Sequence, residues 1–189
     1  MTQPRLFLVT PDKPLSELEA CLRAACAAGD VASLLLPPSA TGLTALAQSL
    51  GVAVVTTGEA GEAVRAGCDG LHLNADDDVA QARKALGKDR YIGVHAGHSR
   101  HAAMEAAEAG ADYIALSQNG PSMGGEPIVK WWVEVFEVPC VAFEPVEPDG
   151  LDTLLPQNPD FIRPSDAMWN SPEAARRIVT ELMRRLKGP

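Results

Sequence analysis

The fold is decided by a phrase that recurs three times: AAGDVASLLL at residues 27–36, RAGCDGLHL at 65–73 and EAGADYIAL at 108–116. In each copy an alanine-rich helical pattern ends at a glycine, followed by a polar step and a short apolar run. Glycine readily adopts the left-handed conformation that ends many helices. Continuous apolar runs are typical of parallel strands that are buried on both faces. The repeat therefore predicts helix–strand units in a parallel sheet.

The same alternation extends along the whole chain and predicts an α/β protein. The expected strands cover residues 6–9, 31–36, 52–56, 70–73, 91–95, 113–117, 140–143 and 161–163. The expected helices cover residues 14–28, 41–50, 61–66, 78–86, 100–109, 127–136 and 172–186, and the link 151–155 is too short for more than a helical turn.

Eight such units favour a closed (β/α)₈ TIM barrel that forms one compact domain over residues 1–189. The loops must be short because the chain is short for this fold. A doubly wound open sheet is the alternative, and the absence of a GxGxxG motif after the first strand disfavours it.

Bulk composition narrows the classes of partner. The chain has 189 residues, 46% hydrophobic residues and a net charge of −9, which argues against nucleic acid and anionic membranes as partners. No apolar run has the length of a membrane span, and no signal peptide is recognised, so we expect a cytoplasmic protein with a small-molecule ligand. The sequence is also compatible with a homo-oligomer. The cysteines lack a CxxC spacing and are expected to be reduced: Cys21, Cys26, Cys68 and Cys140.

Ligands of such barrels bind at the carboxyl ends of the strands, so the residues that end each strand are the candidates. His72 and His95 would end neighbouring strands, where they could belong to a metal site of two or three histidines with a nearby acid. Alternatively, His72 is a core residue with satisfied hydrogen bonds, and His98 and His101 are exposed around a helix start. The acidic run that contains Asp77 could bind Mg²⁺ or could cap the next helix. Sequence alone favours the cap.

Further candidates follow the last three strands. The loop after the sixth strand, QNGPSMGG, carries Gln118, Asn119 and Ser122, and it is either a loop that covers the substrate or a plain turn. Strand seven is followed by Glu144 and strand eight by Ser165 and Asp166.

Three segments of this sequence resemble thiamine phosphate synthases and the related TenI proteins. They are AGCDGLHLNADDD at 66–78, HSRHAAMEAAEAGADYIAL at 98–116 and WWVEVFEVPCVAF at 131–143. The resemblance extends over nearly the whole chain in the right order. It implies a barrel that couples hydroxymethylpyrimidine diphosphate to thiazole phosphate, with Mg²⁺ as cofactor and pyrophosphate as the leaving group. Asp77 matches a Mg²⁺ position of the family, and His72 and Ser165 also match.

Other positions depart from the family pattern. Leu34, Leu36 and Pro38 align with the family's QxRxK-like residues, whose cations hold the pyrophosphate. The segment Thr57–Glu59 aligns with the Asn-Asp-Arg triplet that supplies the other Mg²⁺ ligand, and Ser122 aligns with a Thr that has a Lys nearby in the family.

The phosphate-binding turns after strands seven and eight also differ. Glu144 and Pro145 stand where the family has two glycines, and Asp166 adds a second acid. Proline has no N–H to donate, and both carboxylates would repel a phosphate. We therefore expect the standard coupling reaction to be slow or absent.

Two further hypotheses stay open beside a thiamine phosphate synthase. One is a non-catalytic barrel that binds a ligand or a partner. The other is a changed enzyme whose acids and histidines accept a metal or a cationic ligand; its residues are His72, His95, Asp77, Glu144 and Asp166.

Overall fold

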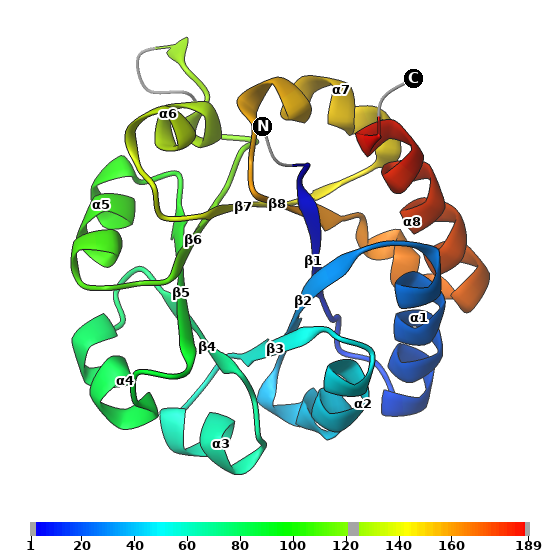
Figure 1. The fold of residues 1–189 in the computed structure, drawn as a ribbon, viewed down its shortest axis with the longest axis horizontal. Helices are drawn as coiled ribbons and strands as arrows, with labels where there is room; N and C mark the ends of the chain where they lie inside the picture. Colours follow the sequence, from blue (N-terminus) through cyan, green and yellow to red (C-terminus); the bar gives the residue numbers. More distant parts are fainter. Residues whose placement is uncertain (1–2, 121–124, 188–189) are drawn as a thin grey trace.

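The structure is a closed barrel of parallel strands in the order β1 to β8. It is a computed structural model that describes residues 3–120 and 125–187. The strands are β1 (Arg5–Val9), β2 (Val31–Leu36), β3 (Ala53–Thr56), β4 (Gly70–Asn74), β5 (Tyr91–Gly97), β6 (Tyr113–Leu116), β7 (Cys140–Val146) and β8 (Phe161–Pro164). Figure 1, viewed along the barrel, shows the helices as an outer ring around the strands. The predicted α/β barrel is confirmed.

The outer ring contains eight α-helices and several short 3₁₀ turns within the described residues. The helices are α1 (Leu15–Ala28), α2 (Thr44–Ser49), α3 (Ala60–Arg65), α4 (Val79–Leu86), α5 (Arg100–Glu108), α6 (Ile128–Val135), α7 (Leu151–Leu154) and α8 (Pro172–Leu186). The segment expected to hold only a helical turn is α7. The helix expected over 41–50 begins later, because Pro38–Leu43 forms a 3₁₀ turn that precedes α2.

Two strands are longer than their apolar runs indicate. β5 continues to Gly97, and β7 continues through Glu144 and Pro145 to Val146. The β7 extension pairs with β8 between Val146 and Pro164, after an irregularity that follows Ala142. The acids after the seventh apolar run therefore begin inside a strand, and the expectation that they form a turn is wrong.

The strands bury side chains on both faces. Outward-facing residues pack against the helices in one large cluster, and inward-facing residues such as Phe7, Leu35 and Val141 form a second cluster inside the barrel. This two-sided burial explains the continuous apolar runs in the sequence.

The glycines of the repeated phrase do two different things. Gly67 and Gly110 have φ angles of 69° and 94° and adopt the predicted left-handed conformation. Gly29 is extended, with φ −168°, so the prediction of a left-handed cap is wrong there. A Cβ on Gly29 would overlap Met183 and Val179 of α8. Gly29 therefore allows α8 to approach the end of α1, which lies beside it in Figure 1.

Each copy of the repeated phrase has an aspartate shortly after its glycine. In the second copy this aspartate holds the start of the strand that precedes it in the barrel. Asp69, just before β4, accepts a hydrogen bond from the Val54 N–H of β3 at 2.7 Å. Its own N–H donates to the Val54 carbonyl at 2.7 Å, so the two residues are joined at two points. Gln48 of α2 adds a third contact, at 3.1 Å to the same carboxylate.

We call this contact a carboxylate clasp: an aspartate just before one strand accepts a hydrogen bond from a backbone N–H of the preceding strand. The clasp recurs around the barrel. The Ile92 N–H donates to Asp112 at 2.7 Å, and the Cys140 N–H donates to Asp160 at 2.8 Å. The clasps thus join β3 to β4, β5 to β6 and β7 to β8. Before β2, the side chain of Asp30 instead forms a bidentate ion pair with Arg5 of β1, with both N–O distances 2.7 Å.

Two other features agree with the sequence. The cysteines are free thiols, as expected. Among the described residues, no helix combines the length and apolar character needed to cross a membrane.

We predict that Asp69→Ala lowers the free energy of unfolding by about 1–3 kcal/mol, because it leaves the Val54 N–H of β3 without its charged acceptor. Urea denaturation measures the effect. Asp89→Ala, an exposed aspartate, serves as the control and should change the free energy by less than about 0.5 kcal/mol. Equal losses in the two variants would contradict a special role for the clasp.

Candidate functional site

The carboxyl end of the barrel holds a cluster of aromatic and imidazole rings. His72 on β4 and His95 on β5 lie on neighbouring strands, as predicted, with ring centroids 6.4 Å apart. Phe143 of β7 packs against both, with centroids 5.2 Å from His72 and 4.6 Å from His95. The rings therefore form a shared apolar floor beneath the strand ends.

His72 is held by a buried hydrogen bond. Only 6% of the residue is exposed, and its Nδ1 lies 2.7 Å from the Tyr113 hydroxyl. Burial, assisted by His95, lowers the pKa of His72 to about 3. Burial also raises the pKa of the Tyr113 hydroxyl. At neutral pH both groups are therefore uncharged.

The hydrogen bond between His72 and Tyr113 decides which nitrogen of His72 carries the proton. Nε2 is buried and has no hydrogen-bond partner among residues 3–120 and 125–187. If Tyr113 donates to Nδ1, one donor, the Nε2–H, stays unpaired. If Nδ1–H donated instead, both the tyrosine proton and the Nε2 lone pair would be unpaired. The first arrangement leaves fewer buried polar groups unsatisfied, so we assign Nε2–H as a donor.

His72 borders a cavity of about 490 Å³ between the ends of β3 and β4. The polar lining residues are Thr57, Glu59, His72, Asn74, Asp77, Asp78 and Gln81. Asp78 caps α4 by accepting from the Gln81 N–H at 2.9 Å. This agrees with the prediction that the acidic run caps the next helix. Asp77 accepts from the Asn74 N–H at 2.7 Å. Glu59 stands at the start of α3, and its side chain makes no capping bond.

The acids and histidines do not form a metal centre by themselves. Among the described residues, no three His, Cys, Asp or Glu side chains are placed to hold one ion. Glu59 and Asp77 offer two carboxylates to the same cavity. Mg²⁺ prefers octahedral oxygen coordination, so its remaining ligands would have to be waters or phosphate oxygens of a substrate. These side chains alone therefore do not make a resident Mg²⁺ site.

The candidates near β6 and β7 are largely engaged with the backbone. The Gln118 amide donates to the Glu144 carbonyl at 2.9 Å and accepts from the Glu144 N–H at 3.0 Å. It thereby continues the hydrogen bonding between β6 and β7 beyond their last backbone pair. His95 Nε2 lies 3.3 Å from the Ser117 hydroxyl, and Asn119 is exposed. Ser122 lies outside the described residues.

The end of β8 is occupied by carboxylates of the chain itself. The Ser165 hydroxyl donates to Glu147 and accepts from the Ala167 N–H at 3.2 Å, and the Ser165 N–H donates to the Val146 carbonyl. Both carboxylate oxygens of Asp166 accept from one guanidinium nitrogen of Arg163, at 2.8 and 2.9 Å.

Sequence reasoning missed Arg163, Glu147 and Tyr113. The guanidinium of Arg163 lies 5.4 Å from the Phe143 ring centroid and donates to the Phe143 carbonyl at 3.3 Å. Strand alternation could have found it, because Phe161, Arg163 and Ser165 share one face of β8 and a charge on an inward face is unusual. No local signal indicates the roles of Glu147 and Tyr113.

Alternation also corrects the residues assigned to β2. Leu34 and Leu36 are fully buried against the helices. The inward positions are Ser33 and Leu35, which are also uncharged. Pro38 is exposed in the 3₁₀ turn beyond the strand.

Comparisons with known proteins agree with this architecture. The sequence profile described as thiamine monophosphate synthase matches residues 6–162. The chain belongs to the thiamine monophosphate synthase family. It is 35% identical to the thiamine-phosphate synthase of Rhodospirillum centenum over 209 aligned positions that cover both chains completely. It is 38% identical to the corresponding protein of Erythrobacter litoralis, over 70% of this chain and 67% of that one.

Solved structures support the fold of this thiamine monophosphate synthase family member. The thiamine phosphate pyrophosphorylase of Pyrococcus furiosus superposes with a TM-score of 0.78 at 20% identity, covering 98% of this chain and 96% of that one. The native KDPGal structure superposes with a TM-score of 0.77 at 15% identity, covering 97% and 95%. At such identities the likeness shows the barrel and not the chemistry.

We predict that His72 makes stability depend on pH. Its pKa is lowered from 6.5 to about 3 on folding, so the unfolded chain binds one more proton between these values. Stability should fall as the pH drops below 6.5, by up to about 1.4 kcal/mol per pH unit. In His72→Gln this contribution disappears, and the loss of stability between about pH 6.5 and 4.5 should shrink by roughly 2–3 kcal/mol.

Urea denaturation at several pH values measures this slope. His101→Gln is the matched control, because His101 is exposed on α5 and pairs only with the exposed Glu105 at 3.2 Å. The same slope in wild type and His72→Gln would show that His72 is not buried in its neutral form.

Proposed function

We propose that this thiamine monophosphate synthase family member binds an uncharged or cationic heterocycle at the carboxyl end of its barrel, and that it couples hydroxymethylpyrimidine diphosphate to thiazole phosphate slowly or not at all. The observation that carries the proposal is the occupation of the β7 and β8 ends by Glu147 and Asp166. Arg163 and the Ser165 hydroxyl, which could bind a phosphate there, are already bonded to carboxylates of the chain.

Electrostatics opposes a phosphate at this end. Glu144 adds a third carboxylate on β7, and the cation of Arg163 is already paired with Asp166. The ammonium of Lys13 donates to the Trp169 carbonyl, just after β8, at 2.8 Å. A carboxylate 4–6 Å from a phosphate costs on the order of 1–4 kcal/mol per pair of charges. A phosphorylated ligand would therefore have to displace at least one acid from its present partner.

The leaving group of the coupling reaction also lacks stabilisation at β2. Pyrophosphate departure develops negative charge that Arg, Lys or a metal ion must stabilise. The inward β2 positions, Ser33 and Leu35, offer no charge. Glu59 and Asp77 could hold a Mg²⁺ ion only together with waters or the substrate's own phosphate oxygens. The thiamine biosynthetic reaction is thus disfavoured at two places, namely where the thiazole phosphate would bind and where the pyrophosphate would leave.

The cavity at β3 and β4 instead suits an aminopyrimidine without phosphates. The carboxylates of Glu59 and Asp77 line this cavity and can accept from an amino group, and the amide of Gln81 can donate to a ring nitrogen. Gln118, Asn119, Glu144, Ser165 and the neighbouring His95 would then shape the mouth of the site rather than cradle an anion.

A coupled-substrate assay tests the proposal. With hydroxymethylpyrimidine diphosphate, thiazole phosphate and Mg²⁺, we expect no thiamine phosphate above background. A kcat/KM near about 10⁴ M⁻¹s⁻¹, at the low end of ordinary enzymes, would overturn the proposal. In parallel, calorimetry should show that hydroxymethylpyrimidine binds more tightly than its diphosphate, and that Glu59→Gln weakens this binding while His101→Gln leaves it unchanged.

A second prediction concerns Glu147. Glu147→Gln removes one negative charge from the end of β8 but keeps a group that can accept from Ser165, so the affinity for inorganic phosphate should rise by about tenfold at low salt. Phosphate titration followed by calorimetry measures the change. Glu137→Gln, at an exposed site before β7, is the control. No difference between the two variants would exclude electrostatic blocking by Glu147.

A further inference from the structure

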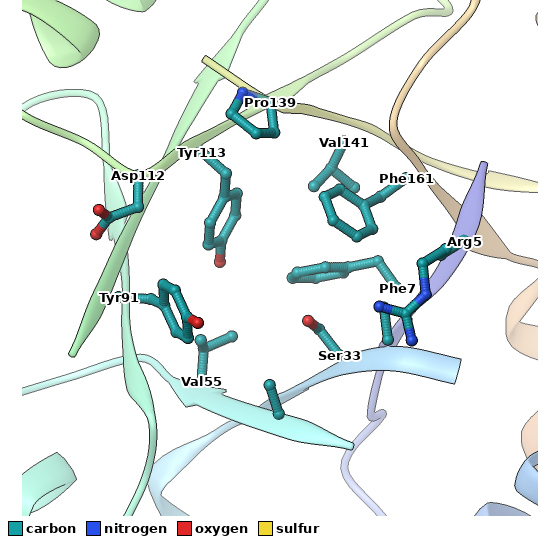
Figure 2. A pocket seen from close by; sticks show the side chains of 12 residues that line it. Arg5, Phe7, Ser33, Val55, Tyr91, Asp112, Tyr113, Pro139, Val141 and Phe161 are labelled. Carbon is teal, nitrogen blue, oxygen red and sulfur yellow. The ribbon is translucent and has the colours of Figure 1, made fainter. Parts of the chain in front are cut away.

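A second cavity opens at the amino-terminal end of the barrel, opposite the candidate site. Its volume is about 380 Å³. The side chains that line it come from strand starts and point toward a common space (Figure 2). They include Phe7, Ser33, Ala53, Tyr91, Tyr113 and Phe161. TIM-barrel interiors are normally filled by layers of side chains, so an open layer at this end needs a specific cause.

The cause is a lack of bulky side chains on one side of the barrel. Ser33 of β2 and Ala53 of β3 are small residues that line the cavity. Gly93 of β5 also has no side chain, but the Tyr113 ring lies across it and occupies that place. The open space therefore lies beside Ser33 and Ala53.

The walls are aromatic. Phe7 and Tyr113 pack with ring centroids 5.6 Å apart and planes tilted by 57°. Phe161 also borders the space, and Tyr91 is 54% exposed at its mouth (Figure 2). Tilted and offset rings are the arrangement in which an added aromatic ring packs favourably by face or edge.

The charges at the rim are already neutralised. Arg5 forms its bidentate pair with Asp30, and Asp112 accepts from Arg83 at 2.5 Å as well as from the Ile92 N–H. An ionised ligand would therefore lose its hydration without gaining a counter-charge.

One polar group faces the cavity without a partner. Within the described ranges, the hydroxyl of Ser33 makes no hydrogen bond, and it points into the cavity in Figure 2. The Tyr91 hydroxyl lies at the rim on the other side. Both can accept or donate one hydrogen bond.

We propose that this cavity is a binding site for a small, uncharged aromatic molecule that carries one hydrogen-bonding group. The aromatic walls select a flat ring, the paired rim charges select against an ionised ligand, and Ser33 or Tyr91 bonds the polar group. The site is separate from the carboxyl end and does not depend on the function proposed for it.

Indole is a suitable probe because it is flat, uncharged and has one N–H. Calorimetry of the full chain should give a Kd on the order of 0.1–1 mM, as expected for a ligand of this size. Amide signals in ¹H–¹⁵N spectra should shift around Ser33, Tyr91 and Gly93. Benzoate, which is flat but charged, should bind more weakly.

Two leucine substitutions separate the cavities. Ala53→Leu fills the amino-terminal cavity and should abolish indole binding. Ala85→Leu places its side chain in the cavity at β3 and β4 and should leave indole binding unchanged. Ala53→Val provides a milder filling change if the leucine variant does not fold, and it should weaken binding.

Three results would overturn the proposal. They are no binding of indole at several millimolar, benzoate binding as tightly as indole, or indole binding that Ala85→Leu removes and both Ala53 variants retain.

Discussion

The barrel depends on carboxylates that join its strands in pairs at their amino-terminal ends. Closing a sheet requires every strand to keep a fixed stagger against its neighbours. Asp69, Asp112 and Asp160 each accept a backbone N–H from the first two residues of the preceding strand, which fixes three of the strand pairs at their starts. Because side chains alternate along a strand, a slip of one residue would turn every inward group outward. The clasps join β3 to β4 and β5 to β6, and the pairing of β4 with β5 between them places His72 and His95 near each other within the barrel.

Tyr113 links the two ends of the barrel interior. Its ring forms part of the wall of the amino-terminal cavity, and its hydroxyl bonds to His72, which borders the cavity at the other end. Gly93 makes room for this ring. This buried hydrogen bond orients the His72 ring, and burial keeps the ring neutral by lowering its pKa. Buried polar pairs of this kind hold their geometry because neither partner can turn to water.

Family membership and local chemistry are separate matters in this chain. Identity of 35% over the full length fixes the family and the barrel. The extension of β7 through Val146 brings Glu147 against Ser165, and Asp166 folds back onto Arg163. These contacts decide which charges face a ligand at the carboxyl end. A fold supports many chemistries, and the residues at the strand ends select among them.

The sequence by itself determined the strand order, the helix–strand repeat and the end of the barrel that carries His72 and His95. These features follow from local patterns, namely apolar runs, glycine positions and alternation, which are written within a few residues of one another. The sequence alone did not reveal the partners of Asp166 and Gln118. It also did not reveal the extended conformation of Gly29 or the hydrogen bond between His72 and Tyr113. Each of these depends on residues from different elements of the fold, most of them far apart in the chain. Only the closed barrel brings them within contact, because the distance between two side chains across its interior is set by the registers of all the intervening strands.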